Sequence, residues 1–272
     1  MRITLGVLAG LSLAAAFGGC DLISEATSNQ IMLAQLIQTP TQQVGTPGGT
    51  QTIAGHVVTN VFLGTRESST DTSPPTPTTG AKVHVEFGNG ESVDLPEAGS
   101  GNYSATDTVT YTPGNTYRFV AEVGSDTFAV SVTAPPSEHI DEFHPDGGFT
   151  VQDPFIPVSA NTDLTLHRAP ADGQQTIALT TVVPVSSTGP GQPNYIDPPL
   201  DANTLLNVVL DPTQYEQPTV TVDGTKAWPA CDPADYLVTV TGLKKGDAEG
   251  SNLFLGSTAL AGSADGAPAH CQ

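Results

Sequence analysis

The hydrophobic pattern of the chain changes after its first segment. Met1 and Arg2 precede a largely apolar run, Ile3–Phe17, and two small residues, Gly18 and Gly19, follow it. A positive charge, a short apolar stretch and small residues at its end are typical of an export signal. The run is shorter than the roughly 20 apolar residues that a membrane-spanning helix needs. We therefore expect residues 1–19 to be a cleaved signal peptide.

From residue 52 onward apolar residues recur with the period of two that is typical of half-buried strands. In the first half we expect strands at 53–63, 82–87, 91–95, 101–105, 115–123 and 126–134. Asn89-Gly90 predicts a type I′ hairpin, which needs a positive φ at both central residues. The Ser/Thr/Pro-rich residues 67–79 are expected to lie outside the sheet. Before this region, residues 29–38 fit a strand or a short helix, and 39–50 have the composition of a flexible linker.

Pro135 and Pro136 predict a boundary, because neither residue can donate a backbone hydrogen bond to a sheet. A second set of short strands is expected at 149–151, 163–166, 175–185, 205–210, 218–222, 236–242 and 253–255. Residues 188–200 contain four prolines and predict a long loop. Many short strands separated by turns favour sandwiches or barrels. We therefore expect an all-β fold: two antiparallel β-sandwich domains in tandem, residues 52–136 and 137–272, after a signal peptide and a tether.

Composition supports this fold class and limits the choice of partners. The chain has 28 glycines and 23 prolines, which favours turns over long helices. It has 28 acidic against 8 basic residues, a net charge of -20. Nucleic-acid binding needs clustered lysines and arginines to neutralise phosphates. We therefore expect no nucleic-acid partner.

The residues at the end of the apolar run resemble the lipobox of bacterial lipoproteins. The residues that carry the likeness are Phe17-Gly18-Gly19-Cys20, with Phe17 in place of the usual leucine. The resemblance implies that Cys20 becomes the first residue of the mature chain and carries acyl chains. Residues 20–51 are then a lipidated N-terminus and tether, and the protein is lipid-anchored in the bacterial cell envelope, at the outer membrane or the periplasmic face. The alternative is a plain secretory signal with an unrelated cysteine.

Short motifs in the two halves resemble known envelope modules. Ile53-Ala-Gly55, Gly80-Ala-x-Val83, Gly101-x-Tyr103 and Pro113-Gly114-x-x-Tyr117 are similar to the carboxypeptidase regulatory-like or transthyretin-like modules of bacterial surface lipoproteins. The likeness covers roughly residues 52–135 and implies a β-sandwich. Leu164-Thr-Leu166 and Asp235-Tyr-Leu-Val-Thr-Val240 resemble strands of immunoglobulin-like or fibronectin-like domains. The second half is therefore expected to be a sandwich of that kind.

Cys231 and Cys271 remain if Cys20 is lipidated. Exported proteins reach compartments in which disulfides persist, so the two remaining cysteines predict one disulfide bridge. The alternative is two free thiols.

A cluster of potential metal ligands follows the Pro-Pro boundary: His139, Asp141, Glu142, His144 and Asp146. Histidine and carboxylate ligands suit zinc or another transition metal. On an extended segment His139 and Asp141 face one side while Glu142 and His144 face the other, so the set converges only if the segment turns. We favour the alternative, a solvated acidic connector. Calcium held between loops from distant positions is a further alternative, and no cofactor is expected.

The chain contains none of the common nucleophile-elbow, zinc-protease, P-loop or dinucleotide-binding motifs. We therefore expect a protein that is not an enzyme, a structural or binding module for an envelope protein or polysaccharide. The alternative is a metal- or carbohydrate-binding lipoprotein that uses residues 139–146 or the loop at 188–200. In that loop Tyr195 is a candidate to stack on a sugar, whereas Trp228 is expected to pack in a core.

Overall fold

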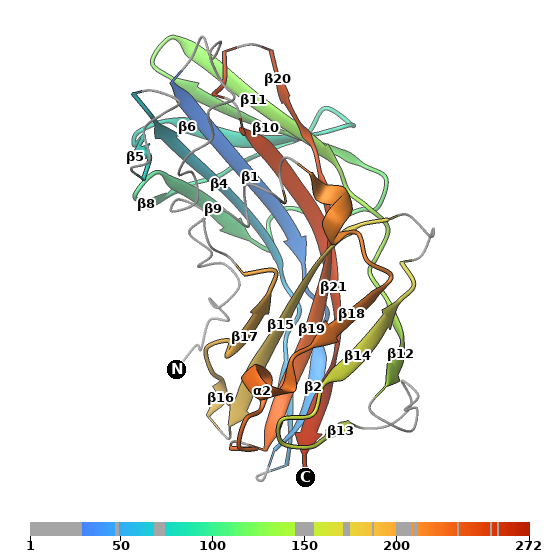
Figure 1. The fold of residues 1–272 in the computed structure, drawn as a ribbon. Coiled ribbons are helices and arrows are strands. Elements are labelled where there is room, and N and C mark those ends of the chain that lie inside the picture. The colour runs from blue at the N-terminus through green and yellow to red at the C-terminus, as the bar shows by residue number, and fades with distance from the viewer. Residues whose placement is uncertain are drawn as a thin grey trace.

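The computed structural model describes residues 29–46, 49–67, 74–144, 155–170, 175–186, 188–199, 208, 211–232, 234–250, 252–254 and 256–272. Within these residues strands dominate, and the helices with described bounds are single turns, η2 (Pro212–Tyr215) and α2 (Gly224–Ala227). None of the described helices is long and apolar enough to cross a membrane. The expected all-β fold class is confirmed (Figure 1).

One eleven-stranded sheet runs through the molecule. Its main path is β16 (Gly189–Pro190), β15 (Ile177–Ser186), β19 (Asp235–Lys245), β21 (Thr258–Cys271), β1 (Gln30–Gln38), β4 (Val57–Thr65), β9 (Asn102–Thr106) and β8 (Glu97–Gly99). Three further strands pair beside this path: β13 (Ile156–Val158) with β21, β17 (Tyr195–Asp197) with β15 and β5 (Thr76–Pro77) with β4. Among the described pairs, β1 and β13 run parallel to β21 and the rest are antiparallel.

Smaller sheets cover this large sheet. A five-stranded sheet contains β20 (Asp247–Glu249), β11 (Asp126–Thr133), β10 (Thr116–Val123), β6 (Lys82–Phe87) and β7 (Ser92–Asp94). A three-stranded sheet contains β12 (Ile140–His144), β14 (Leu164–Arg168) and β18 (Thr219–Val222). Strands β2 (Gln42–Thr46) and β3 (Gly49–Ile53) form a hairpin. In Figure 1 the five-stranded sheet lies at the top of the view and the three-stranded sheet at the lower right.

Two main cores fill the spaces between these layers. The first core lies between the five-stranded sheet and strands β1, β4 and β21, and it includes Leu36, Val61, Phe119 and Ala261. The second core lies between the three-stranded sheet and strands β15, β19 and β21, around Trp228. Alternating apolar residues on each strand supply both cores, as the period of two requires.

Strand β21 belongs to both cores and was not predicted from the sequence. Its sequence, TALAGSADGAPAHC, is rich in alanine and glycine, which are depleted in strands. Small residues nevertheless suit this position. A Cβ atom built on Gly262 would collide with the carbonyl oxygen of Gly242 on the neighbouring strand β19. Burial at the centre of the sheet overrides the low intrinsic propensity.

Most of the expected strands are present. The structure places strands β4, β6, β7, β9, β10, β11, β14, β15, β18 and β19 at the expected sites to within a few residues. The expected strands at 149–151 and 205–210 lie outside the described residues, apart from Val208. Leu253 and Phe254 are buried but do not belong to a strand. The segment 29–38, whose sequence fits a strand or a short helix, forms strand β1 from Gln30 to Gln38.

Three local predictions were wrong. Residues 39–50 are not a linker but contribute to the β2–β3 hairpin, because Val44 is buried against Val185 and Leu237. Residues 188–200 are not a plain loop, because β16 and β17 both pair with β15. Within the insert, the short strand β5 pairs with the end of β4.

The hairpin at Asn89-Gly90 is present, but its turn is not of type I′. Of the two residues only Gly90 has a positive φ, 85°. The Gly90 N–H donates to the Phe87 carbonyl at 3.0 Å, and the Phe87 N–H donates to the Glu91 carbonyl at 2.9 Å. A turn followed by a glycine in the left-handed region is the common three-residue hairpin with a bulge.

The division at residue 136 stays a prediction, and the large sheet crosses it. Strand β1 precedes residue 52, strand β21 follows residue 137, and the two pair side by side between β4 and β19. The first core takes Met32, Ala34 and Leu36 from β1 and Ala259 and Ala261 from β21. The core of the first half therefore depends on strands outside residues 52–136.

We predict that a fragment of residues 52–136 does not fold alone. Without β1 and β21, the apolar face of β4 and the inner face of the five-stranded sheet lose the strands that complete their core. The fragment should lack a cooperative thermal transition by circular dichroism, whereas a fragment of residues 29–272 should melt cooperatively as β-structure. A cooperative, reversible β transition of residues 52–136 would instead establish two independent domains.

Candidate functional site

One face of β21 changes from apolar to polar and back to apolar along its length. Ala259 and Ala261 lie in the first core, and Ala269 and Cys271 lie in the second. Between them, at the same period of two, come Ser263 and Asp265. The segment that joins the first half to the second crosses β21 at this polar interval. The interval is the centre of the candidate site.

The connector between the two halves, which includes residues 138–140, is hydrogen-bonded to this interval. The Glu138 N–H donates to Ser263 Oγ at 2.7 Å, and the Ile140 N–H donates to Asp265 Oδ2 at 2.9 Å. These side-chain oxygens satisfy backbone groups that would otherwise be buried without a partner. The connector is therefore fixed to β21.

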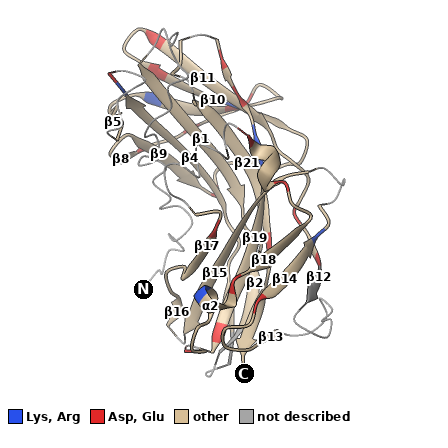
Figure 2. Ribbon diagram, viewed as in Figure 1, with Lys and Arg blue, Asp and Glu red and all other residues tan. Residues whose placement is uncertain are grey.

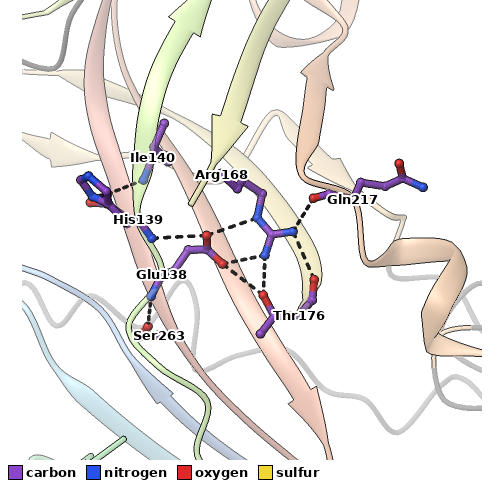
Figure 3. A network of polar contacts seen from close by, with 8 residues as sticks. Glu138, His139, Ile140, Arg168, Thr176, Gln217 and Ser263 are labelled. Atoms are coloured by element: carbon purple, nitrogen blue, oxygen red, sulfur yellow. Dashed lines mark hydrogen bonds and ion pairs between the residues drawn. The ribbon is translucent and has the colours of Figure 1, made fainter. Parts of the chain in front are cut away.

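A buried ion pair stands beside this connector (Figure 3). The Arg168 and Glu138 side chains are only 2% and 1% exposed, and Nη2 of Arg168 lies 2.6 Å from Oε2 of Glu138. Nε of Arg168 donates to Oε1 of Glu138 at 3.3 Å, so the contact is bidentate. Bidentate contacts of this kind are the stronger and more specific ones.

The remaining donors of Arg168 bind two other segments. Nη1 donates to the Thr176 carbonyl at 3.1 Å and to the Gln217 carbonyl at 2.7 Å, and Nη2 donates to Thr176 Oγ1 at 2.6 Å. A guanidinium has five N–H donors, and together with the contacts to Glu138 all five are used. The network joins the connector to the end of β14, the start of β15 and the segment before β18 (Figure 3).

Strand β19 has a glycine, Gly242, where it packs against this ion pair. A Cβ atom at Gly242 would collide with Oε2 of Glu138 and would lie 2.8 Å from Oγ1 of Thr176. A glycine is thus required where the carboxylate packs against the sheet.

A buried tyrosine extends the network toward the first half. The Tyr111 hydroxyl donates to the Pro135 carbonyl at 2.7 Å. Burial raises the pKa of Tyr111 well above its usual value, and a hydrogen bond with Ser263 opposes that rise in part. The phenol therefore stays neutral at physiological pH and acts as a hydrogen-bonding group.

A cavity of about 260 Å³ adjoins Arg168. Its lining includes Arg168, Ala169, Pro170, Gln175, Thr176, Glu216, Gln217 and Pro218. Because every guanidinium donor is already bonded within the protein, Arg168 has no free N–H to offer a ligand there. The arrangement holds segments together, and we assign it a structural role.

The expected metal ligands are separated where they are described. His139 Nδ1 lies 3.2 Å from Oδ2 of Asp265, and Asp141 Oδ1 lies 2.6 Å from Nδ1 of His167. Glu142 and His144 belong to strand β12, but their side chains, like Asp146, lie outside the described residues. Among the described residues, no three histidine, cysteine or acidic side chains form a group that could hold a metal ion. The five-residue metal site stays a prediction that metal analysis of the purified protein can test.

The expected disulfide is present between Cys231 and Cys271, whose Cα atoms are 5.3 Å apart. This separation falls within the usual range for bridged cysteines. The bridge ties the end of β21 to the loop after α2. Cys20 lies outside the described residues, so its lipidation stays a prediction.

Tyr195, the candidate for sugar stacking, and Trp228 are both buried. Trp228 is fully buried, donates from Nε1 to the Thr162 carbonyl at 2.8 Å, and packs edge-on against Tyr236. Tyr195 is 8% exposed, and its hydroxyl donates to the Thr221 carbonyl. Neither ring offers a face to a sugar.

Sequence reasoning missed Glu138, Arg168 and Thr176. One signal was available, because Leu164, Leu166 and Arg168 fall on the same face of one strand. The two leucines are fully buried, so an arginine at the third position must also be buried and needs a buried acidic partner. The sequence alone does not identify that partner as Glu138.

No protein-family model matches the chain, and no curated protein does either.

The buried pair predicts an asymmetric response to substitution. Arg168→Met should lower the free energy of unfolding by about 3–5 kcal/mol, since it leaves Glu138 as an uncompensated buried charge. The double variant Arg168→Met/Glu138→Leu should recover much of that loss. As a matched control, Arg118→Met removes a partly exposed arginine that bonds Glu86 and Glu249, and should cost about 0–1 kcal/mol. Denaturant unfolding measures all three, and a cost for Arg168→Met no larger than that of Arg118→Met would contradict the assigned role.

The disulfide should contribute measurable stability. Cys231 and Cys271 are 40 residues apart, and closing a loop of that size contributes about 3–4 kcal/mol in the chain-entropy model. Cys231→Ser/Cys271→Ser should lower the unfolding midpoint accordingly. Intact mass after alkylation, with and without reduction, reports the bridge directly. Two thiols that alkylate without reduction would show that the bridge does not form.

Proposed function

We propose that this chain is a lipid-anchored protein of the bacterial cell envelope that acts as a non-catalytic structural or binding module. The anchor is the Cys20 acyl group, and the partners are an envelope protein or polysaccharide. The lipobox-like Phe17-Gly18-Gly19-Cys20 supports the anchor, and the likeness of residues 52–135 to modules of surface lipoproteins supports the class.

The lipobox-like segment that ends at Cys20 is the observation that carries this proposal, and the folded body begins soon after it. Strand β1 starts at Gln30 and lies inside the large sheet, ten residues after Cys20. Ten extended residues span at most about 35 Å. A chain anchored at Cys20 would therefore hold its body close to the membrane surface.

The polar groups of the candidate site support a structural role. Two deeply buried charged groups, Arg168 and Glu138, are bonded to each other and to backbone carbonyls or hydroxyls of neighbouring segments. A catalytic acid or base must lie within hydrogen-bonding distance of a reacting group. The hydrogen bonds of this pair go instead to the connector and the neighbouring strands.

Charge limits the partners of the module. Carboxylates are spread over both halves and cations are few (Figure 2), in keeping with the net charge of -20. Such a surface repels nucleic acid and suits a neutral or basic partner. The alternative sites at residues 139–146 and 188–200 gain no support, because His139 and Asp141 have separate partners and Tyr195 is buried.

Replacing the cysteine tests the anchor. In the wild type the protein should sediment with membranes after a high-salt wash and should incorporate labelled palmitate. Cys20→Ser should release it into the soluble fraction, since acyl chains contribute about 0.8 kcal/mol for each buried CH₂. Ser24→Ala, in the same segment, is the matched control and should remain with the membrane. Sedimentation of Cys20→Ser with the membranes would overturn the lipid anchor.

A further inference from the structure

A polar groove of about 480 Å³ opens on the first half, away from the buried ion pair. One wall is the turn between β6 and β7, with Asn89 and Glu91. The other is the segment before β10, with Thr108, Thr110 and Thr112. Its volume falls within the roughly 300–1,000 Å³ that is usual for ligand sites.

The three threonines point outward because their neighbours point inward. Val109 and Tyr111 alternate with them and are 2% and 6% exposed in the first core, so Thr108, Thr110 and Thr112 present their hydroxyls to solvent. Among the described residues, these three hydroxyls have no hydrogen-bond partner. They are available to a ligand.

Tyr117, at the base of the groove, holds the threonine segment in place. The Tyr117 hydroxyl donates to the Thr110 carbonyl at 2.7 Å and accepts from the Thr112 N–H at 2.8 Å. The half-buried ring of Phe87 packs edge-on against Tyr117, with centroids 5.8 Å apart. The groove thus combines an aromatic surface with a row of hydroxyls on a segment that is already ordered, which lowers the entropy cost of binding.

The lining residues limit the chemistry of a ligand. They include no lysine, arginine or histidine, and the protein carries a net charge of -20, so an anion finds no counter-charge. Glu91 is the only carboxylate among them and accepts from the Asn89 amide at 2.9 Å, whereas a calcium ion takes six to eight oxygen ligands, typically with several carboxylates. Hydroxyls, an amide and an aromatic ring match a neutral, polyhydroxylated ligand.

We propose that this groove binds a neutral saccharide chain, with the threonine hydroxyls and Asn89 as hydrogen-bond partners and Phe87 as the apolar contact. The inference rests on the proposed function, since an envelope-anchored module meets polysaccharide. It moves carbohydrate binding from residues 188–200, where Tyr195 is buried, to the β6–β7 end of the first half.

Affinity electrophoresis and calorimetry of the mature protein test this proposal. The probes are neutral oligosaccharides, namely hexamers of α-1,4-glucose, β-1,4-glucose and β-1,4-xylose and a tetramer of N-acetylglucosamine, with dextran sulfate as the anionic comparison. At least one neutral probe should bind, and Thr108→Val/Thr110→Val should weaken that binding tenfold or more. Thr219→Val, an exposed threonine on β18, is the matched control and should bind like the wild type. Thermal melting checks that each variant folds.

Each outcome has a defined meaning. Binding of dextran sulfate alone, or of none of the probes at millimolar concentration, overturns the saccharide site. Binding that survives Thr108→Val/Thr110→Val unchanged places the ligand elsewhere and overturns this groove. The membrane anchoring of Cys20→Ser is read independently, so failure of the groove and failure of the proposed function are distinguishable.

Discussion

Close packing of backbones around β21 is the constraint on which the rest of this structure depends. The strand lies between β1 and β19 and is buried over much of its length. Side chains larger than hydrogen at Gly262 and Gly266 would meet backbone atoms of β19. Glycine usually weakens a strand, and its presence often marks a site where another backbone approaches closely. Here that approach lets one strand contribute to two cores, since Ala261 packs in the first and Ala269 in the second.

Between these two cores, the same strand has to satisfy the connector that crosses it. An apolar β21 would leave the N–H groups of Glu138 and Ile140 without partners in a buried region, at a cost of about 1–3 kcal/mol each. Ser263 and Asp265 remove that cost. The Arg168–Glu138 pair adds specificity, because one guanidinium bonds three segments that are distant in the sequence. Gly242 provides the space for its carboxylate. Replacement by hydrophobic residues can preserve stability at such a pair, so we interpret it as fixing the geometry of the connector.

The sequence predicted the strands that alternate and missed those that do not. Residues 82–87 and 116–123 carry apolar residues at every second position, and both are strands. Strand β21 offers mostly alanine, glycine and serine, and its burial follows from neighbours such as β1 that lie more than 200 residues away in the chain. The β2–β3 hairpin failed for a related reason. Its residues are mostly polar, which favoured a linker, and the burial of Val44 depends on Val185 and Leu237 far along the chain.

The candidate sites also differ in how far the sequence alone predicts them. The disulfide followed from counting cysteines, a property of the whole sequence. The ligand-rich segment at 139–146 was conspicuous because its members are close together in the sequence. Simple alternation would put His139 and Asp141 on one face, yet the register shifts between Ile140 and Glu142, and the two residues pair separately with Asp265 and His167. Arg168, Glu138 and Thr176 carry no local motif and meet only in the folded chain. The groove beside Thr110 is of this kind as well, since Phe87 reaches Tyr117 across paired strands. Sites assembled across strands become visible once the register is known, because register decides which side chains share a face.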